Sequence, residues 1–157
     1  MDGVLCDFEG AYYRDLAAYP EIEFPQSRKG FYKNLTPIDG SQDAMQYLLE
    51  AKEIEPYILT APSIYNPLSY TEKRLWVENY LGFDWVERLI ISPDKSLLRG
   101  EVLIDDHDLG RGQDKFQGQL IKFGSPDYPD WSRVINELNR LQSVSYTHLT
   151  LPTIYSV

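Results

Sequence analysis

The chain opens with Met1-Asp2-Gly3-Val4-Leu5-Cys6-Asp7-Phe8, an acidic turn that bears a glycine and precedes an aromatic-rich helical pattern. Three later apolar runs each end in residues that suit phosphate chemistry. They are residues 57–59 before Thr60, residues 88–91 before Ser92 and Lys95, and residues 102–104 before Asp105 and Asp106. We expect the polar groups that follow these runs to converge on the place where Asp2 lies.

Composition narrows the classes of function. The 157 residues carry a formal net charge of −9, which argues against nucleic-acid polymers and anionic membrane surfaces as partners. Cys6 is the one cysteine, so no intrachain disulfide can form and a reducing compartment is expected. No apolar run approaches the ~20 residues that span a membrane. No signal-peptide pattern opens the chain, so we expect a cytoplasmic protein.

Apolar periodicity predicts strands that alternate with helices. Helices are predicted over residues 9–19, from a cap at Asp39 to residue 51, from a cap at Thr71 to Gly82, and after a cap at Asp130. Strands are predicted over residues 57–59, 88–92, 101–105 and 119–123. This order indicates an α/β fold with one parallel, doubly wound sheet and helices on both faces. We expect a single domain over residues 1–143, with a small helical cap insertion at about 9–37 that serves as a lid or as a surface connection.

Residues 144–157 break the pattern, because charge disappears and threonine, leucine and tyrosine dominate. The string resembles translated adaptor sequence from the ends of assembled genes. We therefore expect this tail to be foreign to the natural protein, exclude it from the predicted fold, and give His148 no role.

The ends of the predicted strands carry the candidate site. Ligands of open parallel sheets bind at the carboxyl ends of the strands, where Thr60, Lys95, Asp105 and Asp106 lie. Taken singly, each of these residues has an ordinary alternative role as a cap, a solvated cation or a turn residue. Together with Asp2 they form a set that suits phosphate chemistry: paired carboxylates for Mg²⁺, a lysine for phosphate oxygens and a threonine hydroxyl.

Four segments in order resemble the motifs of the haloacid dehalogenase superfamily. They are Asp2-Gly3-Val4-Leu5-Cys6-Asp7-Phe8, Ile58-Leu59-Thr60-Ala61-Pro62-Ser63, Ser92-Pro93-Asp94-Lys95 and Leu103-Ile104-Asp105-Asp106. Within that superfamily the chain is similar to the 5′(3′)-deoxyribonucleotidases, and the stretch Tyr70-Thr71-Glu72-Lys73-Arg74-Leu75-Trp76-Val77-Glu78 supports the narrower assignment. The resemblance runs from residue 1 to about residue 140. It implies a Rossmann-like sheet and a Mg²⁺-dependent phosphatase of (deoxy)ribonucleoside 5′-monophosphates that works through an aspartyl-phosphate.

The resemblance also implies roles for individual residues. Asp2 matches the acid/base aspartate, whose backbone carbonyl would face the metal, and Asp106 matches the Mg²⁺ ligand, with Asp105 in support. Thr60 and Lys95 match the residues that hold the phosphate and steady the nucleophile. The remaining substrate-binding positions implied are Phe8, Phe31, Tyr32, Ala61 and Lys73, and the two aromatic residues of the cap, Phe31 and Tyr32, are the weaker inference.

One departure from the family pattern stands out. The motif reads Asp-x-Asp-Gly and its first aspartate is the nucleophile, but here Met1 directly precedes Asp2. The nucleophile and the central strand that bears it would therefore precede residue 1. We expect a chain truncated at its start, with its middle strand missing, that is inactive and marginal in stability.

Three alternatives remain open at this point. A receiver domain uses similar residues, but its acidic pair comes early and its lysine last, the reverse of the order here. A phosphatase of the same superfamily could act on another small phosphoester, because the lid sets the choice of substrate. A relative without catalysis could bind nucleotides only. Base preference, 5′ or 3′ selectivity and a homodimer are also left open by the sequence.

Overall fold

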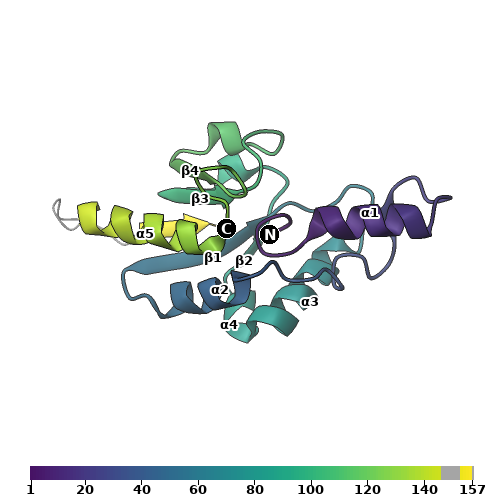
Figure 1. Ribbon diagram of the computed structural model, residues 1–157, viewed down its shortest axis with the longest axis horizontal. Helices are drawn as coiled ribbons and strands as arrows, with labels where there is room; N and C mark the ends of the chain where they lie inside the picture. The colour runs from purple at the N-terminus through teal and green to yellow at the C-terminus, as the bar shows by residue number, and fades with distance from the viewer. Residues whose placement is uncertain (146–152, 157) are drawn as a thin grey trace.

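The computed structural model describes residues 1–145 and 153–156, which form one parallel sheet with helices packed against it (Figure 1). Its α-helices are α1 (Phe8–Ala18), α2 (Ser41–Glu50), α3 (Ser69–Leu81), α4 (Phe83–Val86) and α5 (Trp131–Ser145). Three 3₁₀ turns are η1 (Pro25–Ser27), η2 (Lys95–Leu97) and η3 (Gln113–Lys115). The strands are β1 (Ile54–Thr60), β2 (Leu89–Ile91), β3 (Val102–Asp105), β4 (Gln119–Lys122) and β5 (Thr153–Ser156). No described helix has the length and apolar character that crossing a membrane requires.

The sheet has the order β2-β1-β5-β3-β4, and every neighbouring pair runs parallel. The predicted α/β class and parallel sheet are therefore confirmed, and all four predicted strands are present. Since parallel strands share one direction, the carboxyl ends of β1 and β3 meet at one edge of the sheet.

The central position of the sheet belongs to β5. This strand pairs with β1 from Ile54↔Thr153 to Tyr57↔Ser156, and with β3 at Val102↔Tyr155 and Leu103↔Ser156. The gap expected in the middle of the sheet is therefore not seen among the described residues. Without β5, the backbone N–H and C=O groups on the facing edges of β1 and β3 would lack hydrogen-bond partners, which favours a strand between them. Of the predicted foreign tail, residues 146–152 and 157, with His148, lie outside the described residues.

Side chains along the strands alternate between two apolar clusters, as the pleat requires. The larger cluster lies under α2, α3 and α5 and includes Ile58, Val102, Ile104 and Ile121. The smaller cluster contains Leu59 and Leu103 on the opposite face, packed against Phe116 and Leu98 at the ends of η3 and η2. Among the described residues, one face is thus covered by α-helices and the other by short 3₁₀ turns and their loops. The predicted α-helices on both faces are therefore found on one face only.

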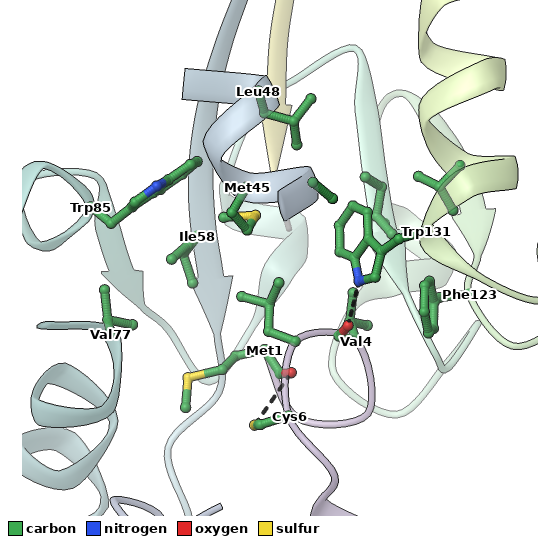
Figure 2. Packing of buried hydrophobic residues seen from close by; sticks show 14 of the residues in the cluster. Met1, Val4, Cys6, Met45, Leu48, Ile58, Val77, Trp85, Phe123 and Trp131 are labelled. Atoms are coloured by element: carbon green, nitrogen blue, oxygen red, sulfur yellow. Dashed lines mark hydrogen bonds between the residues drawn. The ribbon is translucent and has the colours of Figure 1, made fainter. Parts of the chain in front are cut away.

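Residues 1–6 fold into a tight loop that enters the larger cluster (Figure 2). The carbonyl oxygen of Met1 accepts from the backbone N–H groups of Val4, Leu5 and Cys6 at 3.2, 2.8 and 3.3 Å. The indole Nε1 of Trp131, from α5, donates to the carbonyl of Val4 at 2.9 Å. These bonds hold Asp2 and Gly3 in a fixed turn at the edge of the sheet.

Residues 8–35 leave the N-terminal loop and return to it. The N–H of Asp7 donates to the carbonyl of Thr36, and that of Ile38 donates to the carbonyl of Leu5, each at 2.9 Å. Helix α1 begins this excursion and projects away from the sheet (Figure 1). The excursion covers most of the predicted cap insertion at about 9–37, and the role of this segment as a cap stays a prediction.

Helix starts were predicted less well than helix positions. Helix α2 is capped by Gly40 in the left-handed region (φ +74°), so the predicted cap at Asp39 is wrong. Helix α3 begins at Ser69, so the predicted cap at Thr71 is also wrong, because Thr71 lies inside the first turn. Asp130 does cap α5, since its Oδ1 accepts from the N–H of Arg133 at 2.9 Å.

Candidate active site

A cavity of about 1050 Å³ opens at the carboxyl ends of β1 and β3 and is bounded on one side by the 8–35 excursion. The structure thus brings together residues from four separate parts of the sequence. Of the predicted site residues, the following line this cavity: Asp2, Phe8, Tyr32, Thr60, Ala61, Lys95, Asp105 and Asp106. Lys73 and Phe31 are buried behind the lining.

Lys73 links the N-terminal loop to the end of β1. Its Nζ donates to Oδ2 of Asp2 at 2.6 Å and to Oγ1 of Thr60 at 2.9 Å, and the ring of Tyr32 lies 4.8 Å from it. The lysine side chain is fully buried, whereas that of Asp2 is 30% exposed. A buried ammonium group requires such partners. The carboxylate of Asp2 and the hydroxyl of Thr60 are therefore fixed by the same cation, and both face the cavity.

Lys95 and Asp105 form a second, nearly buried ion pair. Lys95 opens η2, whose N-terminus is capped by the side chain of Asp94 at the N–H of Ser96. Oδ1 of Asp105 also accepts from the N–H of His107 at 3.0 Å and from Nε2 of Gln113 at 3.2 Å. Burial would raise the pKa of Asp105, but the charge of Lys95 and its hydrogen bond outweigh it and hold that pKa below the usual value.

Asp106 is the carboxylate that remains more open to the cavity. Its side chain is 29% exposed, and its Oδ1 lies 3.0 Å from Nδ1 of His107, a ring that is 71% exposed. Gly3, at φ +71°, lies directly against it, because a Cβ added there would stand 2.0 Å from Oδ2 of Asp106. Only glycine therefore lets the Asp2 turn approach this carboxylate so closely.

The donor set fits a hard cation. Ligand atoms of Asp105, Asp106 and His107 all lie within 4.8 Å of one another. The oxygen atoms of the two carboxylates suit Mg²⁺, while the exposed imidazole of His107 does not. Because both oxygens of Asp105 already bind groups of the protein, Asp106 is the better placed of the pair to face an ion.

The amino group of Met1 is buried among these charges. Burial, followed by the nearby charge of Lys95, lowers its pKa, while Asp2 and Asp105 act in the opposite direction. Met1 lines the same cavity as Lys95, Asp2 and Asp105.

Aromatic rings form the side of the cavity that faces the excursion. The ring of Phe8 lies 6.1 Å from those of Tyr12 and Tyr32, measured between centroids. Phe31 meets the edge of Phe8 at 5.5 Å from behind, so it supports this wall and does not line the cavity.

Two residues that support the site, Glu72 and Gln113, were not predicted from the sequence. Glu72, only 4% exposed, accepts from the N–H groups of Gly30 and Tyr32 at 2.6 and 3.1 Å. Gln113 connects Asp105 to the N–H of Arg111 through its side-chain amide. The signal for Glu72 was its place beside Lys73 in a helix that buries both residues, whereas nothing in the glycine-rich loop distinguished Gln113 beforehand.

Comparison with known protein families decides the assignment. A family model described as 5′ nucleotidase, deoxy (pyrimidine), cytosolic type C protein matches residues 21–144. The chain belongs to this family. The type C 5′-nucleotidases are members of the haloacid dehalogenase superfamily, so the resemblance predicted from the four motifs is confirmed.

Several relatives of this type C 5′-nucleotidase are named 5′(3′)-deoxyribonucleotidases. A putative 5′(3′)-deoxyribonucleotidase of Vibrio phage KVP40 is 36% identical over 141 residues, covering 88% of this chain and 81% of the relative. The human cytosolic-type 5′(3′)-deoxyribonucleotidase is 31% identical over 144 residues, covering 73% of this chain and 72% of the relative. A putative 5′(3′)-deoxyribonucleotidase of Bordetella pertussis is 29% identical over 172 residues, covering 86% and 92%. These similarities make the chain a member of a family of phosphoric monoester hydrolases.

Proposed function

We propose that this protein binds (deoxy)ribonucleoside 5′-monophosphates with Mg²⁺ and releases the nucleoside and phosphate. The observation that carries the proposal is the meeting of two cation–carboxylate pairs, Lys73–Asp2 and Lys95–Asp105, at one cavity beside Asp106. Names of the relatives support a nucleotide as the substrate. The aromatic wall of Phe8 and Tyr32 supports a base in that cavity, because rings stack on rings.

The phosphate would lie between Thr60 and Lys95. The hydroxyl of Thr60 and the N–H of Ala61 donate to its oxygens, and Lys95 supplies a positive charge close by. Asp2, held by Lys73, gives a proton to the departing nucleoside oxygen and later takes one from water. Phosphoryl transfer depends mainly on such positioning and charge stabilisation.

Mg²⁺ would be held by Asp106, with Asp105 and the backbone carbonyl of Asp2 in support. When bound, the ion supplies positive charge to the phosphate oxygens. The residues of this chain do the rest: Gly3 lets the Asp2 turn reach Asp106, and Lys95 neutralises Asp105 so that the two adjacent carboxylates repel less.

The attacking group in the proposed reaction is a carboxylate, which forms an aspartyl-phosphate as the nucleoside leaves; water then releases phosphate and restores the carboxylate. In the family pattern this carboxylate comes immediately before the position that Met1 occupies here, and Met1 lines the cavity together with Lys95.

Phosphate release from dUMP and dTMP with Mg²⁺ tests the proposal. The assay compares the 157-residue chain with a variant extended by an apolar strand that ends in Asp directly before Met1. We expect release from the extended variant and none from the 157-residue chain. Release by the 157-residue chain would contradict the expectation about the nucleophile and support the phosphatase. If neither form binds or hydrolyses a nucleoside monophosphate, the proposed function is wrong.

The same assay distinguishes a nucleotidase from a phosphatase that acts on another small phosphoester. Glycerol phosphate and a sugar phosphate present the same phosphate group without a base. If they are hydrolysed as well as dUMP, the aromatic wall does not select a nucleotide and the substrate is a different phosphoester.

A further inference from the structure

Carboxylates outnumber cations in the lining of the cavity, although the proposed substrate is an anion. Among the described residues, five carboxylates line it, those of Asp2, Asp7, Glu9, Asp105 and Asp106, against one lysine and one arginine. Lys95 is paired with Asp105, and Lys73, behind the lining, is paired with Asp2. Both lysines that the phosphate needs are thus already neutralised by carboxylates of the protein.

Arg111 is the other cation of the lining. Among the described residues its guanidinium has no hydrogen-bond or ion-pair partner, although five other arginine and lysine side chains form ion pairs there besides the two in the site. An arginine that faces a cavity and has no carboxylate of its own is available to an anion that enters.

The backbone of Arg111 is fixed next to the phosphate end of the cavity. Its carbonyl oxygen accepts from the N–H of Lys95 at 2.7 Å. Its own N–H donates to Oε1 of Gln113 at 2.8 Å, and Nε2 of the same glutamine donates to Asp105. Arg111 is therefore tied to both members of the Lys95–Asp105 pair without being part of it.

The glycines on either side give this loop its shape. Gly110 and Gly112 have φ values of +102° and +84°, which disfavour other residues. A Cβ at Gly112 would also stand 2.1 Å from Oδ1 of Asp94, the residue that caps η2. The loop of Arg111 thus lies tightly against the start of η2, where Lys95 is.

We infer that Arg111 is a further substrate-binding residue, and that its guanidinium binds oxygens of the substrate's phosphate group. The planar guanidinium can donate two parallel hydrogen bonds to a phosphate, and these bonds are strengthened by charge. The inference goes beyond the proposed function in naming a residue; it rests on that function for the nucleotide, but inorganic phosphate tests it independently.

The experiment measures the dissociation constants of inorganic phosphate, dUMP and deoxyuridine by calorimetry with Mg²⁺ present. It uses the unchanged chain, Arg111→Met, Arg111→Lys and the control Lys115→Met. Lys115 is an exposed cation four residues away that does not line the cavity. Arg111→Met should weaken phosphate and dUMP about tenfold or more and leave deoxyuridine unchanged, with Lys115→Met within twofold of the unchanged chain. Arg111→Lys should recover part of the loss, because it restores charge without the planar fork.

The outcomes separate this inference from the proposed function. If Arg111→Met binds phosphate and dUMP as tightly as the unchanged chain does, the inference is wrong while the nucleotidase proposal stands. If phosphate binding depends on Arg111 but dUMP is not preferred over phosphate, the inference holds and the nucleotide substrate is wrong. Loss of deoxyuridine binding by the same factor would assign Arg111 a structural role and overturn the inference, as would failure of the unchanged chain to bind either phosphate or dUMP.

Discussion

Lys73 and Asp2 form an ion pair with 2.6 Å between Nζ and Oδ2, although 71 residues of sequence separate them. The pair joins helix α3 to the N-terminal loop and points the carboxylate of Asp2 into the cavity.

Replacing Lys73 by methionine should weaken dUMP binding about tenfold or more, because the Asp2 carboxylate then faces the phosphate without its cation. The free energy of unfolding should fall by less than the ~3–5 kcal/mol of a fully buried pair, since Asp2 stays partly exposed. Calorimetry and urea unfolding measure the two effects. Arg74→Met, at an exposed position in an i,i+4 pair with Glu78, is the control and should change neither.

Replacing Glu72 by glutamine should loosen the 8–35 excursion from α3. Its carboxylate is the acceptor for the N–H groups of Gly30 and Tyr32, and the amide would place a donor against one of them. We expect faster hydrogen exchange at those two amides and a loss of about 1–3 kcal/mol in the free energy of unfolding. Unchanged exchange at both amides would contradict the assignment. Glu78→Gln, on the same helix, should leave both amides protected.

Gly3→Ala should reduce Mg²⁺ affinity because the new methyl group would displace the Asp106 carboxylate. Gly82→Ala separates this effect from backbone strain: Gly82 also has positive φ, at +95°, but a Cβ there meets nothing within 4 Å. Each substitution should cost about 1–2 kcal/mol of stability from the left-handed backbone. Only Gly3→Ala should weaken Mg²⁺ in a titration, and equal affinity in both variants would refute the role given to Gly3.

Deleting residues 153–157 should destabilise the chain and broaden its urea transition. In the described sheet, β1–β2 and β3–β4 are joined through β5, so the deletion leaves two separate strand pairs. A chain lacking only Val157, which β5 does not include, is the matched control. If the deletion leaves the unfolding transition unchanged, β5 contributes nothing and residues 144–157 behave as the foreign tail expected from their composition.

The strand ends and their chemistry could be predicted from the sequence because each apolar run stops at a polar residue, and parallel strands place such residues at one edge. This logic located Thr60, Lys95, Asp105 and Asp106. It could not find the central strand, because the composition of residues 144–157 argued against any role in the fold. Helix caps were missed where tertiary structure overrode local preference, as at Gly40 and Leu68.

The contacts that residues 8–35 make with the rest of the protein could not be predicted from the sequence either. Glu72 joins residues 40 and 42 positions away, and no local pattern encodes which backbone amides a buried carboxylate will meet. Phe31 illustrates the same limit, because the sequence placed it near the substrate, whereas its ring packs behind Phe8.

The position of β5 also orders events on the ribosome. Both strand pairs emerge from the exit tunnel before the strand that unites them. Until then, the edges of β1 and β3 expose unpaired backbone N–H and C=O groups. Such late, long-range closure slows folding and leaves time for self-association. Chaperone demand during translation should therefore be high for a molecule of this size.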